Sequence, residues 1–174
     1  MQSRNNVSAS GPPPQSGGLY TADERVRRDA SKWTLVQGIL APVQFLIFGV
    51  SLVLVLRYLA TGDGLAAANG SVILKTLALY AIMITGALWE RDVYGQYLFA
   101  PAFFWEDVVS MAVIALHTAY LAALAGQFLS PAQRFAIALA GYATYVINAS
   151  QFVLKLRAAR LQETRRRIAG TVAA

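Results

Sequence analysis

The stretch FAPAFFWEDVVSMAVIALHTAY, residues 99–120, begins with aromatic residues, continues with two adjacent carboxylates at Glu106 and Asp107, and ends in a long apolar run. This run holds the single histidine of the protein, His117. Glu106 and His117 are eleven residues apart, about three helical turns, so they project from nearly the same side of a helix. A carboxylate pair at the start of an apolar helix, with a histidine deeper on the same face, indicates a polar site in apolar surroundings.

Apolar residues dominate the rest of the chain as well. Of its 174 residues, 56% are hydrophobic and only 14% are charged, whereas a typical soluble domain has about 25% charged residues. Four apolar runs, residues 35–56, 72–89, 108–128 and 135–154, each have roughly the 17 to 25 residues needed to cross the hydrocarbon core of a bilayer. The sequence therefore predicts an all-α integral membrane protein, with four transmembrane helices in a bundle.

The distribution of basic residues predicts the orientation of the bundle. Lysines and arginines gather before the first run and after the last, whereas residues 57–71 and 129–134 carry a single arginine each. The positive-inside rule then places both termini and the central loop, residues 90–105, in the cytoplasm. We expect three segments: a disordered or amphipathic cytoplasmic N-terminal segment (1–32), a four-helix transmembrane domain (33–162) and a basic cytoplasmic tail (163–174).

Several classes of function are excluded by composition. The chain has no cysteine, which excludes disulfides, thiolate metal sites and cysteine nucleophiles. A single histidine argues against a zinc site built by the protein. The net charge of +6 comes from basic residues that flank the apolar runs, so it predicts contact with membrane lipid and not with nucleic acid.

Each predicted span has one polar stripe, and such stripes face the interior of a bundle because an unpaired polar group in hydrocarbon is costly. Counting about 1.5 Å per residue from the cytoplasmic end, Asn148 lies about 9 Å deep and Gln44 and His117 about 13 Å deep. Glu90 and Gln151 lie near the cytoplasmic end. The simplest arrangement is a pocket that opens to the cytoplasm and narrows to His117, with apolar walls and an acidic mouth. Such a pocket suits a large, flat, apolar ligand with a polar edge.

Structural roles are the alternative for most of these residues. Glu90, Glu106 and Asp107 would then be interfacial charges paired with basic residues, and Asn148 and the glutamines would be interhelical hydrogen-bonding groups. His117 would make a structural hydrogen bond to a neighbouring span. Adjacent residues such as Glu106 and Asp107 point about 100 degrees apart on a helix, so at most one of the two faces the centre of a pocket. The aromatic FAPAFFW cluster reads as an interfacial belt, and Lys75 is expected to snorkel to the outer interface.

Four segments closely resemble one protein family. They are WTLVQGILAPVQF (33–45), KTLALY (75–80), FAPAFFWEDVVSMAVIALHTAYL (99–121) and YATYVINASQFVLKLRAARLQ (142–162). The family is that of the 3-vinyl (bacterio)chlorophyllide hydratases of bacteriochlorophyll biosynthesis, and the resemblance covers residues 33–162. It implies a hydro-lyase that adds water to the 3-vinyl group of a (bacterio)chlorophyllide, giving a 3-(1-hydroxyethyl) product.

The resemblance also implies the setting of the reaction. It places the protein in the inner or intracytoplasmic membrane of a phototrophic bacterium, as a multi-pass protein with no cofactor of its own, because the magnesium is carried by the chlorin substrate. A later dehydrogenase can oxidise the product, and contact with that enzyme is a further expectation. Four spans form a thin wall around a macrocycle, so a homo-oligomer with pigment at an interface is also expected as an alternative arrangement.

The implied chemistry requires an acid, a positioned water and a base. A carboxylic acid beside an apolar wall loses hydration of its charged form and can stay protonated at neutral pH. We therefore expect Glu106 or Asp107 to donate the proton and a second carboxylate, Glu90, to orient or deprotonate the water. His117 is expected to be an axial ligand of the substrate magnesium or, alternatively, to act as the acid or base itself. Further substrate contacts are predicted for Asn148, Gln151, Tyr145, Gln44 and Trp105.

A pigment-binding or assembly protein with no catalytic activity would use the same histidine, aromatic residues and apolar pocket. The carboxylates discriminate weakly between the two functions, because a carrier does not need an acid but tolerates one. A small transporter is disfavoured, since the spans show no inverted repeat and no pair of broken helices at the midplane.

Overall fold

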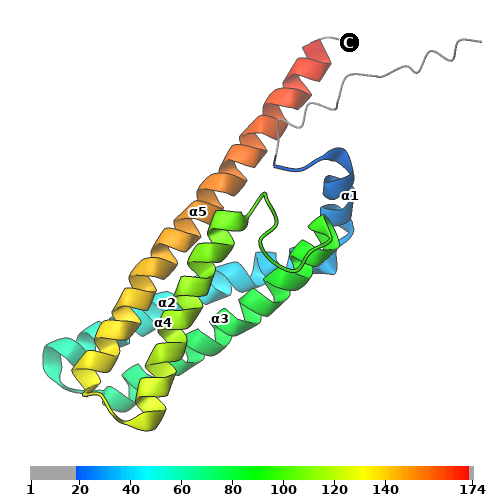
Figure 1. Ribbon diagram of the computed structural model, residues 1–174. Coiled ribbons are helices and arrows are strands. Elements are labelled where there is room, and N and C mark those ends of the chain that lie inside the picture. The colour runs from blue at the N-terminus through cyan, green and yellow to red at the C-terminus, as the bar shows by residue number, and fades with distance from the viewer. Residues whose placement is uncertain (1–18, 173–174) are drawn as a thin grey trace, which may run out of the picture.

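The computed structural model describes residues 19–172, and the regular secondary structure of this part of the chain consists of helices, without strands (Figure 1). A short helix, α1 (Ala22–Ala30), is followed by four long ones: α2 (Lys32–Thr61), α3 (Leu65–Tyr94), α4 (Phe104–Gly126) and α5 (Pro131–Val172). The prediction of an all-α protein is confirmed. Within the described residues, these four helices are each long and apolar enough to cross a membrane, which confirms the predicted number of spans.

The helices differ from the apolar runs in their bounds. Helices α2 and α3 extend beyond the runs at both ends, because amphipathic residues continue the helix past the hydrocarbon-length core. Helix α4 ends at Gly126, so the last residue of the predicted third span, Phe128, lies in the turn to α5. Helix α5 continues without a break into the segment predicted as a basic tail. Residues 1–18, the first part of the segment predicted to be disordered or amphipathic, lie outside the described residues.

Local signals in the sequence explain where the helices begin and end. Thr21 and Glu24 form a capping box at the start of α1, and the Ser31 side chain caps α2. Gly62 (φ 78°) and Gly64 (φ 86°) make the tight turn from α2 to α3 in the left-handed region that glycine adopts without a steric cost. Gly95 (φ 82°) ends α3 in the same way.

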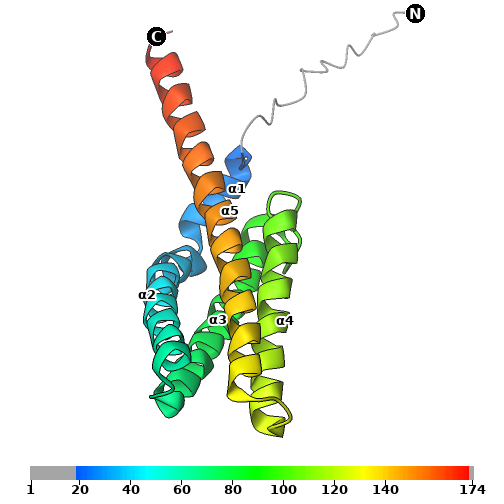
Figure 2. The ribbon, with the colours of Figure 1, turned by 90° about the vertical axis from the view of Figure 1, so that its left-hand side faces the viewer.

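The four long helices form two hairpins. Helix α2 packs along α3, and α4 along α5, whereas contacts between the hairpins are sparser (Figures 1 and 2). Both described chain ends and the α3–α4 loop lie at one end of the bundle, here called the termini end; the turns α2–α3 and α4–α5 lie at the far end. This arrangement agrees with an even number of spans.

Large apolar side chains cover the outside of the bundle, including Leu46, Val50, Val53, Ile84 and Ile147, all more than half exposed. In water such a surface would drive aggregation, and in a bilayer it is the surface that contacts lipid. The polar stripes turn inward, as the sequence predicted: Gln44, Ser51, Thr76 and Asn148 are all buried.

Candidate active site

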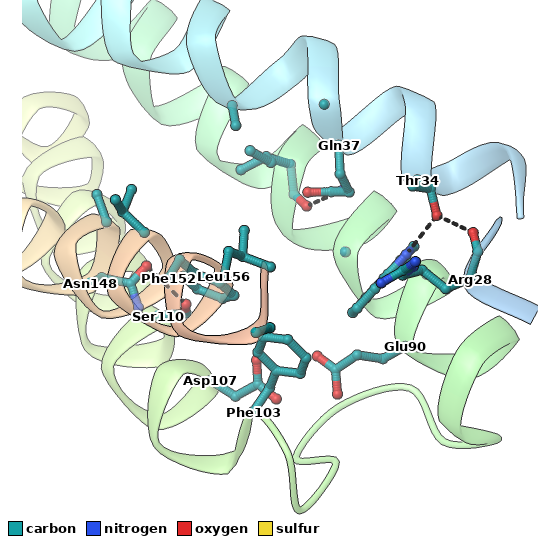
Figure 3. Close-up of a pocket in the computed structure, with 18 of the residues that line it drawn as sticks. Arg28, Thr34, Gln37, Glu90, Phe103, Asp107, Ser110, Asn148, Phe152 and Leu156 are labelled. Atoms are coloured by element: carbon teal, nitrogen blue, oxygen red, sulfur yellow. Dashed lines mark hydrogen bonds between the residues drawn. The ribbon is translucent and has the colours of Figure 1, made fainter. Parts of the chain in front are cut away.

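A cavity of about 840 Å³ lies between the two hairpins, and its lining includes α1 at the termini end. Figure 3 shows a close-up of it. All five helices and the α3–α4 loop contribute to its lining. Ligand-binding cavities are typically about 300 to 1,000 Å³, mostly apolar, with a few convergent polar groups. Here the polar side chains from the membrane-spanning helices are Thr34, Gln37, Gln44, Glu90, Asp107, Ser110, Tyr145, Asn148, Arg160, Gln162 and Glu163.

The carboxyl groups of Glu90 and Asp107 meet at the wall of this cavity. Glu90 comes from the last turns of α3 and Asp107 from the first turn of α4, and they are 5% and 3% exposed. Figure 3 shows both side chains beside Phe103, and the two carboxyl groups lie close enough to interact electrostatically. Residues seventeen positions apart in the sequence thus form a buried pair of acids.

The α3–α4 loop supplies hydrogen bonds to both carboxyl groups. The backbone N–H of Phe99 donates to Asp107 Oδ2 (2.6 Å), and that of Ala100 donates to Glu90 Oε2 (3.1 Å). Phe99 has a left-handed backbone (φ 60°), which is uncommon for a bulky residue. Such local strain is often found at functional sites, where the surrounding structure holds it in place.

Glu106 faces away from the cavity and forms an ion pair with Lys155 of α5. The Lys155 ammonium also donates to the backbone oxygen of Ala102, and the Glu106 backbone oxygen accepts a hydrogen bond from Asn148 Nδ2 (2.8 Å). Glu106 therefore joins α4 to α5. Of the two adjacent carboxylates, only Asp107 borders the cavity, in agreement with the expected divergence of neighbouring helical side chains.

His117 does not reach the cavity. Its ring is fully buried between α4 and α5, against Tyr142 and so close to Gly141 that an added Cβ would lie 2.9 Å from Cε1. Nδ1 is within hydrogen-bonding distance of the Val113 backbone oxygen (2.8 Å), and Nε2 has no partner among the described residues. The cavity ends at Val113, one turn before the histidine.

Glu106 and His117 do share one face of α4, as their spacing predicts, but that face packs against α5. The cavity side of α4 carries Asp107, Ser110 and Val113 instead. A shared helical face is a local property and does not specify which neighbour the face meets.

The remaining predicted contacts divide into two groups. Gln44, Tyr145 and Asn148 line the cavity. Gln151 does not, and Trp105 is 69% exposed on the outside of α4. An exposed tryptophan near the end of a span is typical of an interfacial belt.

Lys75 was expected to snorkel to the outer interface, and this prediction is wrong. The residue is fully buried, with Nζ 3.6 Å from the centre of the Tyr145 ring. Its Cα lies ten residues into α3, about 15 Å along the helix from the far end, and the side chain does not extend to the surface of the protein. The ammonium group turns inward to the aromatic ring, where a cation–π contact partly replaces hydration.

The cavity mouth includes residues that sequence reasoning missed. Tyr20, Arg25, Arg28 and Asp29, in or just before α1, border the opening. Arg28 bonds to Asp29 (2.8 Å) and lies over the Tyr20 ring (4.8 Å). Burial raises the pKa of the Tyr20 hydroxyl, an effect that nearby Arg28 reduces.

Helix α1 is held to the bundle by hydrogen bonds from Arg27 Nε to the Val93 backbone oxygen (2.7 Å) and from Thr34 Oγ1 to the Arg28 backbone oxygen (2.6 Å). Ser31, just after the helix, donates through Oγ to Asp92 (2.7 Å). The capping box in TADE was the signal for this helix. Nothing in the sequence alone indicated that it would lie over the mouth of a cavity.

A bundle of apolar helices enclosing an apolar cavity, with a buried acid pair on its wall, defines a class: a polytopic membrane protein that can bind a large apolar ligand and exchange protons with it. Comparisons with known proteins agree. Residues 20–158 match the family model for 2-vinyl bacteriochlorophyllide hydratase. The chain belongs to this family.

Two relatives carry the same name. The 2-vinyl bacteriochlorophyllide hydratase of Rhodobacter capsulatus is 67% identical over 149 residues, covering 86% of each chain. That of Cereibacter sphaeroides is 67% identical over 144 residues, covering 82% of this chain and 89% of the relative. No solved structure matches the chain.

Proposed function

We infer that the chain is a hydro-lyase that adds water to the vinyl group of a (bacterio)chlorophyllide in bacteriochlorophyll biosynthesis. Membership of the hydratase family supports this function. The vinyl group numbered 2 in the family name is the one numbered 3 in the current tetrapyrrole numbering. The observation that carries the mechanism is the buried pair of Glu90 and Asp107 on the wall of an apolar cavity.

Hydration needs one acid and one base, and the pair can supply both. Two carboxyl groups that share a site in apolar surroundings hold one proton between them, because two adjacent negative charges are costly there. We propose that the protonated member donates to the terminal vinyl carbon, leaving positive charge on the carbon attached to the macrocycle. The conjugated ring delocalises this charge.

Water then attacks the cationic carbon and gives its proton to the ionised member of the pair. The product is the 1-hydroxyethyl group, and the pair again holds one proton, so atoms and charge balance. The N–H groups of Phe99 and Ala100 stabilise whichever carboxylate is ionised. This assigns the chemistry to Glu90 and Asp107 and leaves Glu106 as the partner of Lys155.

The proposal requires no cofactor of the protein, since protonation and water addition involve no net oxidation, and the magnesium is part of the substrate. Clusters of three or more His, Cys, Asp or Glu side chains that could hold a metal are absent from residues 19–172. We place the protein in the inner or intracytoplasmic membrane, with the cavity mouth at the cytoplasmic face, from the basic residues at the termini end.

A homo-oligomer and contact with the next dehydrogenase remain proposals. The cavity and the acid pair lie within one chain, so the proposed reaction does not depend on a second copy. Contact with a dehydrogenase would pass the product directly to the enzyme that oxidises it.

The test is incubation of membranes containing the protein with 3-vinyl chlorophyllide in oxygen-18 water. We expect label in the hydroxyl group of a 1-hydroxyethyl product, detected by mass spectrometry. Pigment that is bound but unchanged would instead indicate a carrier. Label in a product formed at the wild-type rate by a protein lacking both Glu90 and Asp107 carboxyl groups would place the acid elsewhere.

A further inference from the structure

One polar side chain inside the cavity has no partner. Gln44, in the middle of α2, lines the cavity and is 2% exposed, and neither its amide oxygen nor its amide nitrogen has a hydrogen-bond partner among the described residues. A buried amide without partners costs about 1 to 3 kcal/mol. Because this amide belongs to a side chain that lines a ligand cavity, we infer that a group of the bound ligand supplies the missing interaction.

Gln37, one heptad earlier on the same face of α2, provides a contrast. It also lines the cavity, but its Nε2 donates to Thr85 Oγ1 (2.7 Å) and to the Ile82 backbone oxygen (3.2 Å) of α3. Gln37 is therefore engaged in joining the two helices. Gln44 lies about 10 Å deeper along the helix. Its amide is buried and makes no hydrogen bond among the described residues, and because the residue lines the cavity, rotation of the side chain would bring the amide to a ligand.

The chemistry of the ligand limits what can bind the Gln44 oxygen. An amide oxygen is an acceptor and needs a hydrogen-bond donor or a Lewis acid. The carbonyl substituents on the rim of a chlorin are acceptors themselves, whereas its central magnesium is a hard cation that prefers oxygen ligands. The four ring nitrogens occupy its equatorial plane and leave an axial position. Resting on the proposed function, we propose that Gln44 Oε1 is the axial ligand of the substrate magnesium.

The positions of Gln44 and the acid pair are consistent with one bound macrocycle. Thr34 contacts Trp89, the neighbour of Glu90, so Gln44 lies ten residues, about 15 Å along α2, below the level of the acid pair. Helical side chains lean toward the N-terminus of their own helix. Because α2 begins at the termini end and α3 ends there, Gln44 and Glu90 lean toward each other. Gln44 would hold the centre of the ring while a substituent on its rim reaches the acids.

His117, the ligand expected from the sequence, is less suited to this role. Its Nε2 also lacks a partner, but the ring is closed off from the cavity between α4 and Gly141. Gln44 lies on the cavity wall, so rotation of its own side chain, without movement of a helix, would bring Oε1 to the ligand.

The test measures binding without turnover. Two probes are used, the magnesium chlorin with an ethyl group in place of vinyl, which cannot be hydrated, and its metal-free counterpart. Wild-type protein in detergent should bind the magnesium form at least about tenfold more tightly, the factor that corresponds to 1.4 kcal/mol. Gln44→Leu should remove this preference and leave the affinity for the metal-free probe nearly unchanged. Gln37→Leu and His117→Leu should retain the preference.

Gln44→His serves as a rescue variant, since imidazole is also an axial ligand. It should restore the preference for the magnesium probe and shift the absorption bands of the bound pigment, because the donor atom has changed. Equal loss of affinity for both probes in Gln44→Leu would overturn the proposal, as would loss of the magnesium preference in His117→Leu alone. These results are independent of the oxygen-18 assay, so the hydratase function can stand even if the ligand assignment fails.

Discussion

The two ends of the bundle differ in how the hairpins meet. At the far end, side chains interlock across the joint: Ser51 of α2 bonds to Tyr142 of α5 (2.5 Å), and Phe135 packs between Tyr58 and Tyr120. Toward the termini end, the cavity lies between the hairpins. Contacts within each hairpin are extensive, whereas contacts between the hairpins are sparse. The two hairpins therefore pack tightly only where large side chains fill the space between them. A large flat ligand can fill the remainder.

The strongest test of this contrast is removal of the acid pair. Asp107→Asn and Glu90→Gln should each lower turnover by about 10² to 10⁴, the usual contribution of general acid–base groups. Pigment binding should persist, because the cavity keeps its shape. Turnover is measured with the labelled-water assay and binding with the unreactive ethyl chlorin.

Glu106→Gln is the matched control for these variants, since Glu106 is adjacent to Asp107 but pairs with Lys155 outside the cavity. It should retain most of the turnover. A Glu106→Gln protein as inactive as Asp107→Asn would show that the ion pair with α5, and not only the cavity acids, is required for the chemistry.

Substitutions at the far end of the bundle should have the opposite effect: they should lower stability and leave turnover nearly unchanged. Phe135→Ala removes a fully buried ring at the joint between hairpins, and large-to-small changes of this kind cost about 3 to 5 kcal/mol. The free energy of unfolding, measured by denaturant titration in detergent micelles, should fall accordingly. Turnover per folded molecule should change little. A matching replacement at the cavity wall, Phe152→Ala, should cost less stability, because that ring is only partly buried.

Sequence reasoning found the spans because their length and apolarity are local properties. It also placed Gln44, Tyr145 and Asn148 inward, because polar residues in a span avoid lipid. It could not pair Glu90 with Asp107, since that pairing depends on the α3–α4 loop and on the hydrogen bonds that this loop donates.

The predicted position of His117 at the cavity failed for the same reason, because it depends on tertiary packing. The shared face with Glu106 was predicted from helical periodicity, but the identity of the facing helix comes from tertiary packing. Gly141 gave a signal in retrospect: a glycine in α5 leaves room for the His117 ring. Glycine in an apolar span allows such close approach of a neighbouring helix.

Gly141→Ala tests this packing with a smaller expected effect. The added Cβ would lie 2.9 Å from His117 Cε1 and 3.0 Å from Nδ1, and overpacking of this kind costs about 1 to 3 kcal/mol. Thermal unfolding followed by circular dichroism should show a lower Tm. Gly49→Ala is the control, because a Cβ at Gly49 would have no neighbour within 4 Å; an equal loss in both variants would point to a cause other than the histidine contact.

The smallest effect is expected at Lys75, which lies between the tightly packed far end and the cavity. Its ammonium group contacts the Tyr145 ring but has no hydrogen-bond partner among the described residues. Replacing a buried, unpaired cation by an apolar side chain of similar length is often neutral or stabilising. Lys75→Met should therefore leave Tm unchanged or raise it slightly, and turnover should be maintained. A marked loss of pigment affinity in Lys75→Met would instead show that the cation reaches the ligand past Tyr145, and that the floor of the cavity is not sealed at this point.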